Sequence, residues 1–167
     1  MARSIALNYT DSGVSGVTTL KKDIAILNFG SDYRVKQDDA GEAIIANITS
    51  PIDRPETFRF SAAPVADVYK GTGIDSGFYS PSRKGISLLC QLTDVYKYAD
   101  SADSTFKDQY LPISGHMVLK VPCNEALTAD MISTFVGRLI AGLYASGNLD
   151  ASRLKSMLRG ALLPTDM

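Results

Sequence analysis

The pattern of apolar and polar positions divides the chain into a strand-rich part, residues 1–122, and a helical part, residues 128–163. In the first part, short apolar segments alternate with turn-forming residues at short intervals, which is typical of an antiparallel meander. Residues 1–22 are predicted to form an N-terminal hairpin, and residues 23–122 an antiparallel sheet. The fold class predicted is therefore α+β, with the sheet followed by two C-terminal helices.

The clearest alternation lies in a predicted hairpin over residues 42–63, whose loop holds two prolines. Neighbouring residues of a strand lie on opposite faces of the sheet. With its loop centred on Ile52 and Asp53, this hairpin places Asn47 opposite Arg59, and it places Thr49 opposite Thr57. The face that they share carries hydroxyl and amide groups together with a cation.

The last predicted strand, residues 113–122, also has two unlike faces. Met117 and Leu119 fall on the apolar face, and His116 and Lys120 fall on the polar one. Together with the hairpin, this strand can build one polar sheet face from Asn47, Thr49, Thr57, Arg59, Ser61, His116 and Lys120. Such a face is either an ordinary solvent-facing surface or a platform for RNA, with cations for phosphates and polar groups for bases and riboses.

The helical part begins at Thr128, a good N-cap residue, and Asp130 falls in the first turn of the predicted helix. A glycine turn at residues 146–148 ends this helix, and a second, shorter helix follows from Asp150 until Pro164 stops it. The first helix is amphipathic, with an apolar stripe formed by Ile132, Phe135, Val136, Leu139, Ile140 and Leu143.

Composition narrows the function classes. The 167 residues are 45% hydrophobic and 21% charged, which indicates a single domain able to bury a core without disulfide or metal support. Seventeen Lys and Arg residues against eighteen Asp and Glu residues give a net charge of −1. A protein with a strongly basic surface overall is excluded, so only a local basic face could bind nucleic acid.

Catalytic and targeting signals are scarce. No long apolar segment follows Met1 or occurs elsewhere, so neither a signal peptide nor a membrane span is expected. Cys90 and Cys123 do not form a zinc motif and are expected to be buried thiols. His116, the single histidine, lies in mid-strand with no nucleophile motif beside it. We therefore predict no catalytic residue, no metal site and no cofactor.

Three passages resemble the coat proteins of single-stranded RNA bacteriophages of the levivirus type. Residues 45–61, with hydroxyl and basic residues alternating with apolar ones, are similar to the family's paired RNA-binding strands. Residues 116–122 are similar to its last strand, which ends in an apolar residue and proline. The two helices follow in the family's order. The chain is longer than well-known members, chiefly in residues 66–112, and has His116 where they place an amide.

The resemblance implies an intertwined homodimer that pairs through the last strands and buries the apolar stripe of the first helix as a dimer core. Dimers would assemble into an icosahedral T=3 shell in the cytoplasm of a bacterial host and form part of the virion. The polar face would point inward and bind single-stranded genomic RNA, including a hairpin through which the coat protein represses replicase translation. Loops at residues 70–85 and 98–110 would lie between dimers.

Two other functions compete with this interpretation. One is a small dimeric cellular RNA-binding or adaptor module that forms no particles, and the other is an enzyme that uses His116. Electron microscopy separates the shell from the module, and replacement of His116 tests the enzyme. In the coat-protein interpretation the partners are further copies of the chain and single-stranded RNA, and no membrane is involved.

Overall fold

The computed structural model describes residues 27–98, 107–144 and 152–160. The chain forms two compact units, which are considered separately: one spans Ile26–Cys123, and the other comprises residues 1–25 and 124–167. The predicted N-terminal hairpin, residues 1–22, lies outside the described residues.

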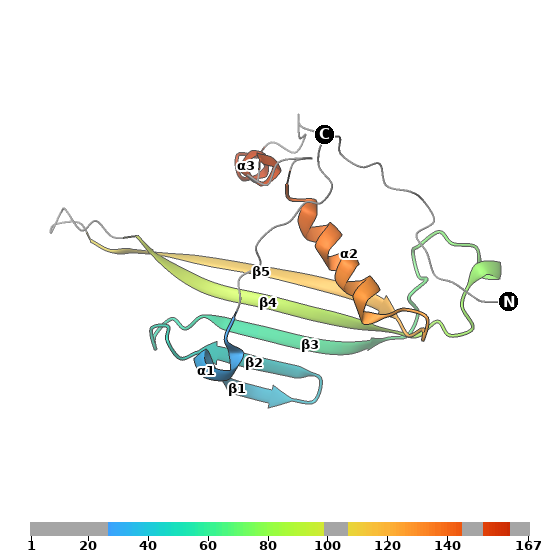
Figure 1. Ribbon diagram of the computed structural model, residues 1–167, viewed down its shortest axis with the longest axis horizontal. Helices are drawn as coiled ribbons and strands as arrows, with labels where there is room; N and C mark the ends of the chain where they lie inside the picture. Colours follow the sequence, from blue (N-terminus) through green and yellow to red (C-terminus); the bar gives the residue numbers. More distant parts are fainter. Residues whose placement is uncertain (1–26, 99–106, 145–151, 161–167) are drawn as a thin grey trace. The chain divides into compact units, whose positions relative to one another are not determined.

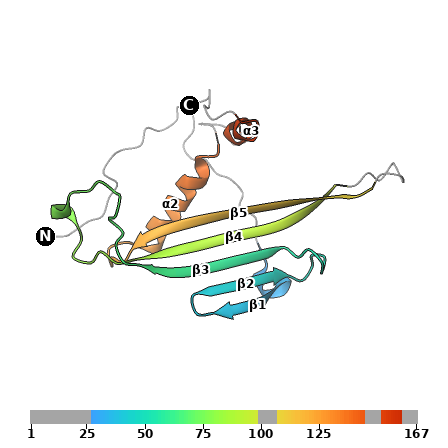
Figure 2. The ribbon, with the colours of Figure 1, turned by 180° about the vertical axis from the view of Figure 1, so that it is seen from behind.

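The first unit is a five-stranded antiparallel sheet in which each strand pairs with the next along the chain (Figures 1 and 2). The order β1-β2-β3-β4-β5 confirms the predicted meander. The strands are Tyr33–Asp39 (β1), Glu42–Asn47 (β2), Thr57–Val65 (β3), Gly85–Tyr98 (β4) and Gln109–Pro122 (β5).

Strands β4 and β5 are longer than predicted. The last strand is predicted over residues 113–122, but β5 already begins at Gln109, and β4 continues to Tyr98. Tyr96 pairs with Leu111 across this extension. Aromatic and branched residues favour strands, and a cross-strand pair of this kind stabilises the two-stranded ribbon. This stabilisation outweighs the low strand propensity of the charged residues nearby.

The β2–β3 hairpin has a different register from the predicted one. Ile44, not Asn47, is paired with Arg59, and Ala46 is paired with Thr57. The register is offset by three residues, and an odd offset moves every β2 side chain to the other face of the sheet. The predicted pairing of Asn47 with Arg59 and of Thr49 with Thr57 is therefore wrong.

The cause is the nine-residue connection between β2 and β3, which the Asn47 side chain closes. Asn47 Oδ1 accepts hydrogen bonds from Thr49 N at 2.9 Å and from Thr49 Oγ1 at 2.7 Å, and Asn47 Nδ2 donates to Glu56 Oε2 at 2.6 Å. The Asn47 N–H also donates to the Glu56 carbonyl at 2.9 Å. These bonds end β2 at Asn47 and leave Thr49 in the connection.

An aromatic cluster forms the centre of the sheet's apolar face. Phe58 is 8% exposed and Tyr33 is 6% exposed, and these are the only large apolar side chains that are buried in the part of the chain described. The Phe58 ring lies 5.7 Å from those of Phe29 and Tyr33, and 5.8 Å from that of Phe60. Phe29 begins α1 (Phe29–Asp32), a short helix capped by Asn28. The cluster therefore joins α1, β1 and β3.

Tyr33 also connects the cluster to the polar end of the hairpin. Its hydroxyl donates to both carboxylate oxygens of Glu56 at 3.1 Å. Burial raises the pKa of Tyr33, and the hydrogen bond and negative charge of Glu56 raise it further. Asn47, Glu56 and Tyr33 thus form a network that holds the hairpin against the cluster.

The β3–β4 connection holds a single-turn 3-10 helix, η1 (Ser76–Phe78), where the sequence predicts a loop. The rings of Tyr69 and Tyr79 stack with centroids 4.1 Å apart, and the Ser80 N–H donates to the Tyr69 hydroxyl at 2.8 Å. The connection is therefore an ordered structure, and it brings Val68 against the first residue of β4.

Gly85, that first residue, has no room for a side chain. An added Cβ would lie 2.3 Å from Val68 Cγ1 and 2.6 Å from the Val121 carbonyl oxygen. We expect Gly85→Ala to lower the free energy of unfolding by about 1–3 kcal/mol because backbone must move. Gly115→Ala, in the same sheet with nothing within 4 Å, is the control and should change it by less than about 0.5 kcal/mol. Urea denaturation measures both, and equal losses would contradict the steric explanation.

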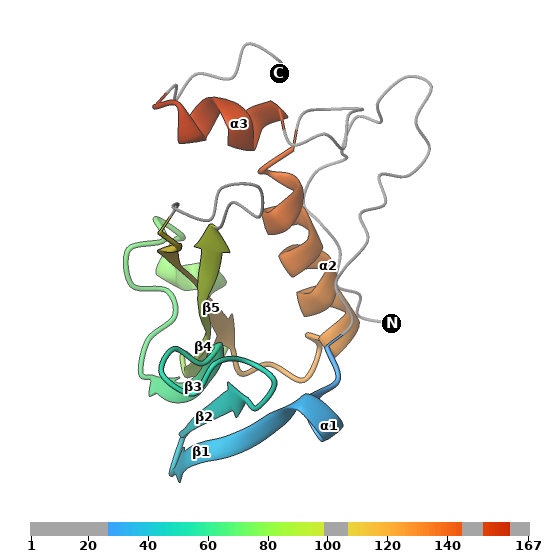
Figure 3. The ribbon, with the colours of Figure 1, turned by 90° about the vertical axis from the view of Figure 1, so that its left-hand side faces the viewer.

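The second unit contains α2 (Ala129–Ala141) and α3 (Ser152–Leu158), seen in side view in Figure 3. Thr128 caps α2 as predicted, with its Oγ1 accepting from Met131 N at 3.3 Å. The helix is shorter than predicted because its last turn tightens: Leu143 N and Tyr144 N donate to carbonyls three residues back. The predicted stop at residues 146–148 and the Asp150 cap lie outside the described residues.

The two cysteines are free, and the prediction that both are buried is wrong. Cys90 is half-buried and Cys123 is exposed. Cys123 follows the end of β5, and its N–H donates to the Lys84 carbonyl at 2.9 Å, so the backbone at this point is anchored while the thiol lies in solvent.

Within the described ranges, no helix has the length and apolarity needed to cross a membrane.

Candidate nucleic-acid interface

The register places five of the seven predicted site residues on one face of the sheet. Arg59 is paired with Gln91, and Gln91 with His116, so these three form a row across β3, β4 and β5. Three neighbouring rows lie on the same face: one contains Thr57, one contains Ser61, and one contains Ser87 paired with Lys120. We call this surface the polar face and define it by Thr57, Arg59, Ser61, Ser87, Gln91, His116 and Lys120.

Asn47 and Thr49 do not belong to the polar face. Asn47 shares the opposite, apolar face with Ile45 and Phe58, and its side chain is used in closing the hairpin. Thr49 lies in the connection and donates to Asn47. Both residues therefore have a structural role. The polar face lacks the Asn47 amide that the sequence predicted for it, and Gln91 supplies an amide instead.

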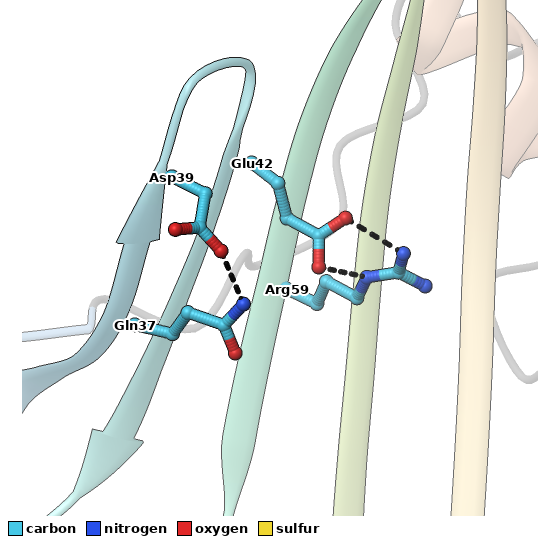
Figure 4. Close-up of polar contacts among 4 residues, drawn as sticks. All are labelled: Gln37, Asp39, Glu42 and Arg59. Atoms are coloured by element: carbon cyan, nitrogen blue, oxygen red, sulfur yellow. Dashed lines mark hydrogen bonds and ion pairs between the residues drawn. The ribbon is translucent and has the colours of Figure 1, made fainter.

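Arg59 is held in an ion pair with Glu42. Arg59 Nε donates to Glu42 Oε1 at 3.0 Å and Arg59 Nη2 donates to Glu42 Oε2 at 2.8 Å, a two-point fork (Figure 4). The hydrogen bond and the charge of Arg59 lower the pKa of Glu42, while Glu42 raises the pKa of Arg59. The positive charge expected from Arg59 is therefore largely compensated within the sheet.

A second carboxylate lies beside this pair. Asp39 is paired with Glu42 across the β1–β2 turn and accepts a hydrogen bond from Gln37 Nε2 (Figure 4). Next to the polar face, β1 and β2 thus add two carboxylates on the same side of the sheet, that of Glu42 bonded to the Arg59 guanidinium and that of Asp39 beside Glu42. The β3 side of the polar face has no excess of positive charge that would attract a phosphate.

The β5 side of the polar face is different. His116 and Lys120 are exposed, and neither forms an ion pair with any residue that the structure describes. Half-buried Gln91 and Ser87 lie beside them on β4. Lys120 is the cation on this side whose charge is available, with hydrogen-bonding groups next to it.

Sequence reasoning missed a third feature at the far end of the sheet. The Arg54 guanidinium lies over the Tyr110 ring at 3.7 Å from its centroid and pairs with Asp53 at 2.6 Å. Lys97, which is paired with Tyr110 in the register, bonds Asp108 at 2.6 Å. The position of Arg54 could not be predicted from the sequence, because Arg54 lies in a loop. The spacing of the tyrosines in β4 and β5 was a signal that could have pointed to this feature. Both cations here are already matched by carboxylates.

No cluster of three or more metal-ligating side chains occurs among residues 27–98, 107–144 and 152–160. The chemistry that the polar face offers is reversible polar binding: one available ammonium, one imidazole, an amide and hydroxyl groups on a rigid sheet. That combination suits phosphates and sugar or base edges better than bond-breaking chemistry.

Comparison with solved structures decides the family. The virus-like particle of bacteriophage AVE015 contains a chain that is 30% identical to this one and superposes with a TM-score of 0.86, over 99% of this chain and 100% of that chain. The chain belongs to the levivirus-type coat proteins of single-stranded RNA bacteriophages. A chain of the virus-like particle of bacteriophage GQ-112 shares the fold, with a TM-score of 0.78 at 16% identity over 96% of this chain and 98% of that one.

No protein-family model and no curated protein matches the coat protein's sequence. The family is therefore visible in the fold and in a distant identity rather than in a shared motif. This agrees with the sequence, where the resemblance rested on the order of strands and helices together with short strings. The function that follows directly is that of a phage capsid protein.

Proposed function

We propose that this coat protein assembles through homodimers into an icosahedral T=3 shell that encloses single-stranded RNA, with the polar face toward the RNA. The observation that carries the proposal is how little apolar surface the chain covers by itself. Among the described residues, Tyr33 and Phe58 are the buried large apolar side chains, whereas more than a dozen others are exposed. Exposed apolar surface on this scale marks contacts with other chains.

Each unit contributes to this uncovered surface. In α2, Phe135 is 60% exposed and Leu139 is 51% exposed, and both belong to the apolar stripe. In the sheet, Leu111 and Ile113 are each 50% exposed on the face opposite to the polar face. We assign the apolar stripe to the dimer core and the sheet's apolar face to contacts with other copies.

The edge strand supports pairing of two copies. β5 lies at the end of the strand order, so one side of a 14-residue strand has no partner in the described sheet. Open edges of this length are normally covered, because they otherwise pair at random. Pairing of β5 with β5 of a second copy about a two-fold axis would continue the sheet. It would also bring both copies of His116 and Lys120 onto one surface.

Lys120 is expected to contribute most to RNA binding. Lys120→Ala should weaken binding of a 20-nucleotide oligouridylate about three- to tenfold near 0.1 M salt, because an available phosphate contact is lost. The slope of log affinity against log salt should fall by about 0.7, the value for one phosphate contact on single-stranded RNA. Filter binding over a salt series measures both quantities.

Lys70→Ala serves as the matched control, since Lys70 is exposed in the β3–β4 connection and not on the polar face. It should leave both quantities unchanged. Equal losses in the two variants would mean that RNA binds by overall charge, and the assignment of the polar face would then be wrong.

Negative-stain microscopy of the purified chain tests assembly. Closed particles of uniform diameter support the shell, and their diameter tests the T=3 assignment. A dimer that never forms particles would favour a dimeric binding module instead. Binding of a genomic RNA hairpin and repression of replicase translation rest on the family resemblance, and they are tested by gel shift with hairpins from the phage's own genome.

A further inference from the structure

The Arg59–Glu42 pair divides the polar face into two electrically different parts. On β5, Lys120 is available, whereas on β3 the Arg59 guanidinium already satisfies a carboxylate with two of its five N–H groups. The Arg59 side chain is nevertheless 43% exposed and that of Glu42 is 28% exposed. A phosphate could therefore reach the guanidinium from solvent, in place of the carboxylate or beside it.

The sheet holds Glu42 in this position. Glu42 is the first residue of β2, directly after Gly41, whose φ of 84° forms the turn from β1. Turn and sheet are joined by a hydrogen bond from Ala62 N to the Gly41 carbonyl at 2.8 Å. Since Glu42 pairs with Ser61 and Ile44 with Arg59, the carboxylate lies diagonally across from Arg59 on the same face.

The Arg59–Glu42 ion pair is weak enough for an RNA phosphate to take the place of the Glu42 carboxylate. The pair is only partly buried, so solvent weakens it, and a phosphate can replace the carboxylate on the guanidinium. While the pair is closed, Arg59 adds no net attraction. The Asp39 carboxylate nearby adds further repulsion toward an approaching phosphate.

We infer that Glu42 sets the RNA affinity of the polar face by competing with RNA phosphates for Arg59, which keeps bound RNA on the β5 side, at Lys120. This rests on the proposed RNA-binding function and adds a regulating residue to it. Glu42 is a specificity-determining residue in this sense: it decides which strands of the sheet the RNA backbone contacts. Arg59 then contacts an RNA phosphate only when RNA displaces the Glu42 carboxylate.

Glu42→Gln tests the inference with little risk to the fold, because the amide has the same shape and the ion pair that is lost is partly open to solvent. We expect this variant of the full-length chain to bind a 20-nucleotide oligouridylate about fivefold more tightly near 0.1 M salt. Its salt slope should be steeper by about 0.7, since one further phosphate contact forms. Filter binding over a salt series gives both values.

Two controls separate release of Arg59 from a simple change in charge. Asp39→Asn removes one negative charge from the same face, but Asp39 bonds Gln37 and not arginine. It should tighten binding less than twofold and leave the salt slope unchanged. In an Arg59→Ala background, Glu42→Gln should lose most of its gain, because no guanidinium remains to be released.

Several outcomes would overturn the inference. One is unchanged or weaker binding by Glu42→Gln, and another is an equal gain in Asp39→Asn or in the Arg59→Ala background. If Lys120→Ala weakens binding while Glu42→Gln has no effect, the RNA-binding face stands and only the role of Glu42 fails. If the unaltered chain binds no RNA at all, the proposed function fails, and the inference fails with it.

Discussion

Replacing Phe58 with alanine is expected to lower the free energy of unfolding by about 3–5 kcal/mol and to abolish recovery of soluble particles. Phe58 is one of the two buried large apolar side chains in the described structure, and its ring contacts those of Phe29, Tyr33 and Phe60. Removal of the ring leaves a cavity in the one place where α1, β1 and β3 meet. Domains are stable by only about 5–15 kcal/mol, so this loss is a large share.

Phe78→Ala is the matched control, because it removes the same atoms from a side chain that is 82% exposed in η1. It should change the free energy of unfolding by less than about 0.5 kcal/mol. Urea denaturation of both variants, followed by tyrosine fluorescence, gives the comparison. If the two variants lose stability equally, the aromatic cluster is not the centre of the sheet.

Much of the sheet could be predicted because its faces differ. Alternation of apolar and polar residues in residues 57–63 and 113–122 gave both strands and the correct face for Arg59, His116 and Lys120. The amphipathic period of residues 128–143 likewise gave α2 and its Thr128 cap. Periodicity reports which side of an element is apolar, and in these elements the two sides are unlike.

The β2–β3 pairing could not be predicted, because β2 is apolar on both faces. Ile44 and Ile45 lie on opposite sides of the strand and fit a core equally well. The register therefore depends on the hairpin connection, which the Asn47 side chain closes through hydrogen bonds to Thr49 and Glu56. Such a closure depends on three-dimensional geometry that alternation does not contain.

The same error concealed the Arg59–Glu42 pair. With the predicted register, Arg59 lay opposite an amide and seemed to be a free cation. With the observed one, Glu42 lies diagonally across from it and matches its charge. One register shift thus changed the electrostatics of the candidate site. The net charge of −1 hides a local distribution: among the described residues of the sheet, carboxylates pair with Arg59 and Lys97 but not with Arg34, Lys36 or Lys120.

Replacing Leu139 with lysine is expected to abolish particle formation while leaving α2 helical. Leu139 belongs to the apolar stripe and is half exposed, so in the proposed dimer its side chain would be covered by a second copy. An ammonium at that place would be buried without a partner, which costs several kcal/mol. The cost recurs in every dimer of the shell, and lysine is itself a good helix former. Microscopy of purified protein should show no particles, and circular dichroism should show unchanged helix content.

Thr134→Lys provides the matched control, because it adds the same charge to the opposite side of α2. Thr134 is exposed, and a lysine four residues after Asp130 favours the helix. This variant should assemble as the unaltered chain does. If Leu139→Lys also yields normal particles, the apolar stripe does not form the contact between copies, and the dimer core must lie on another surface, such as the uncovered sheet face around Leu111 and Ile113.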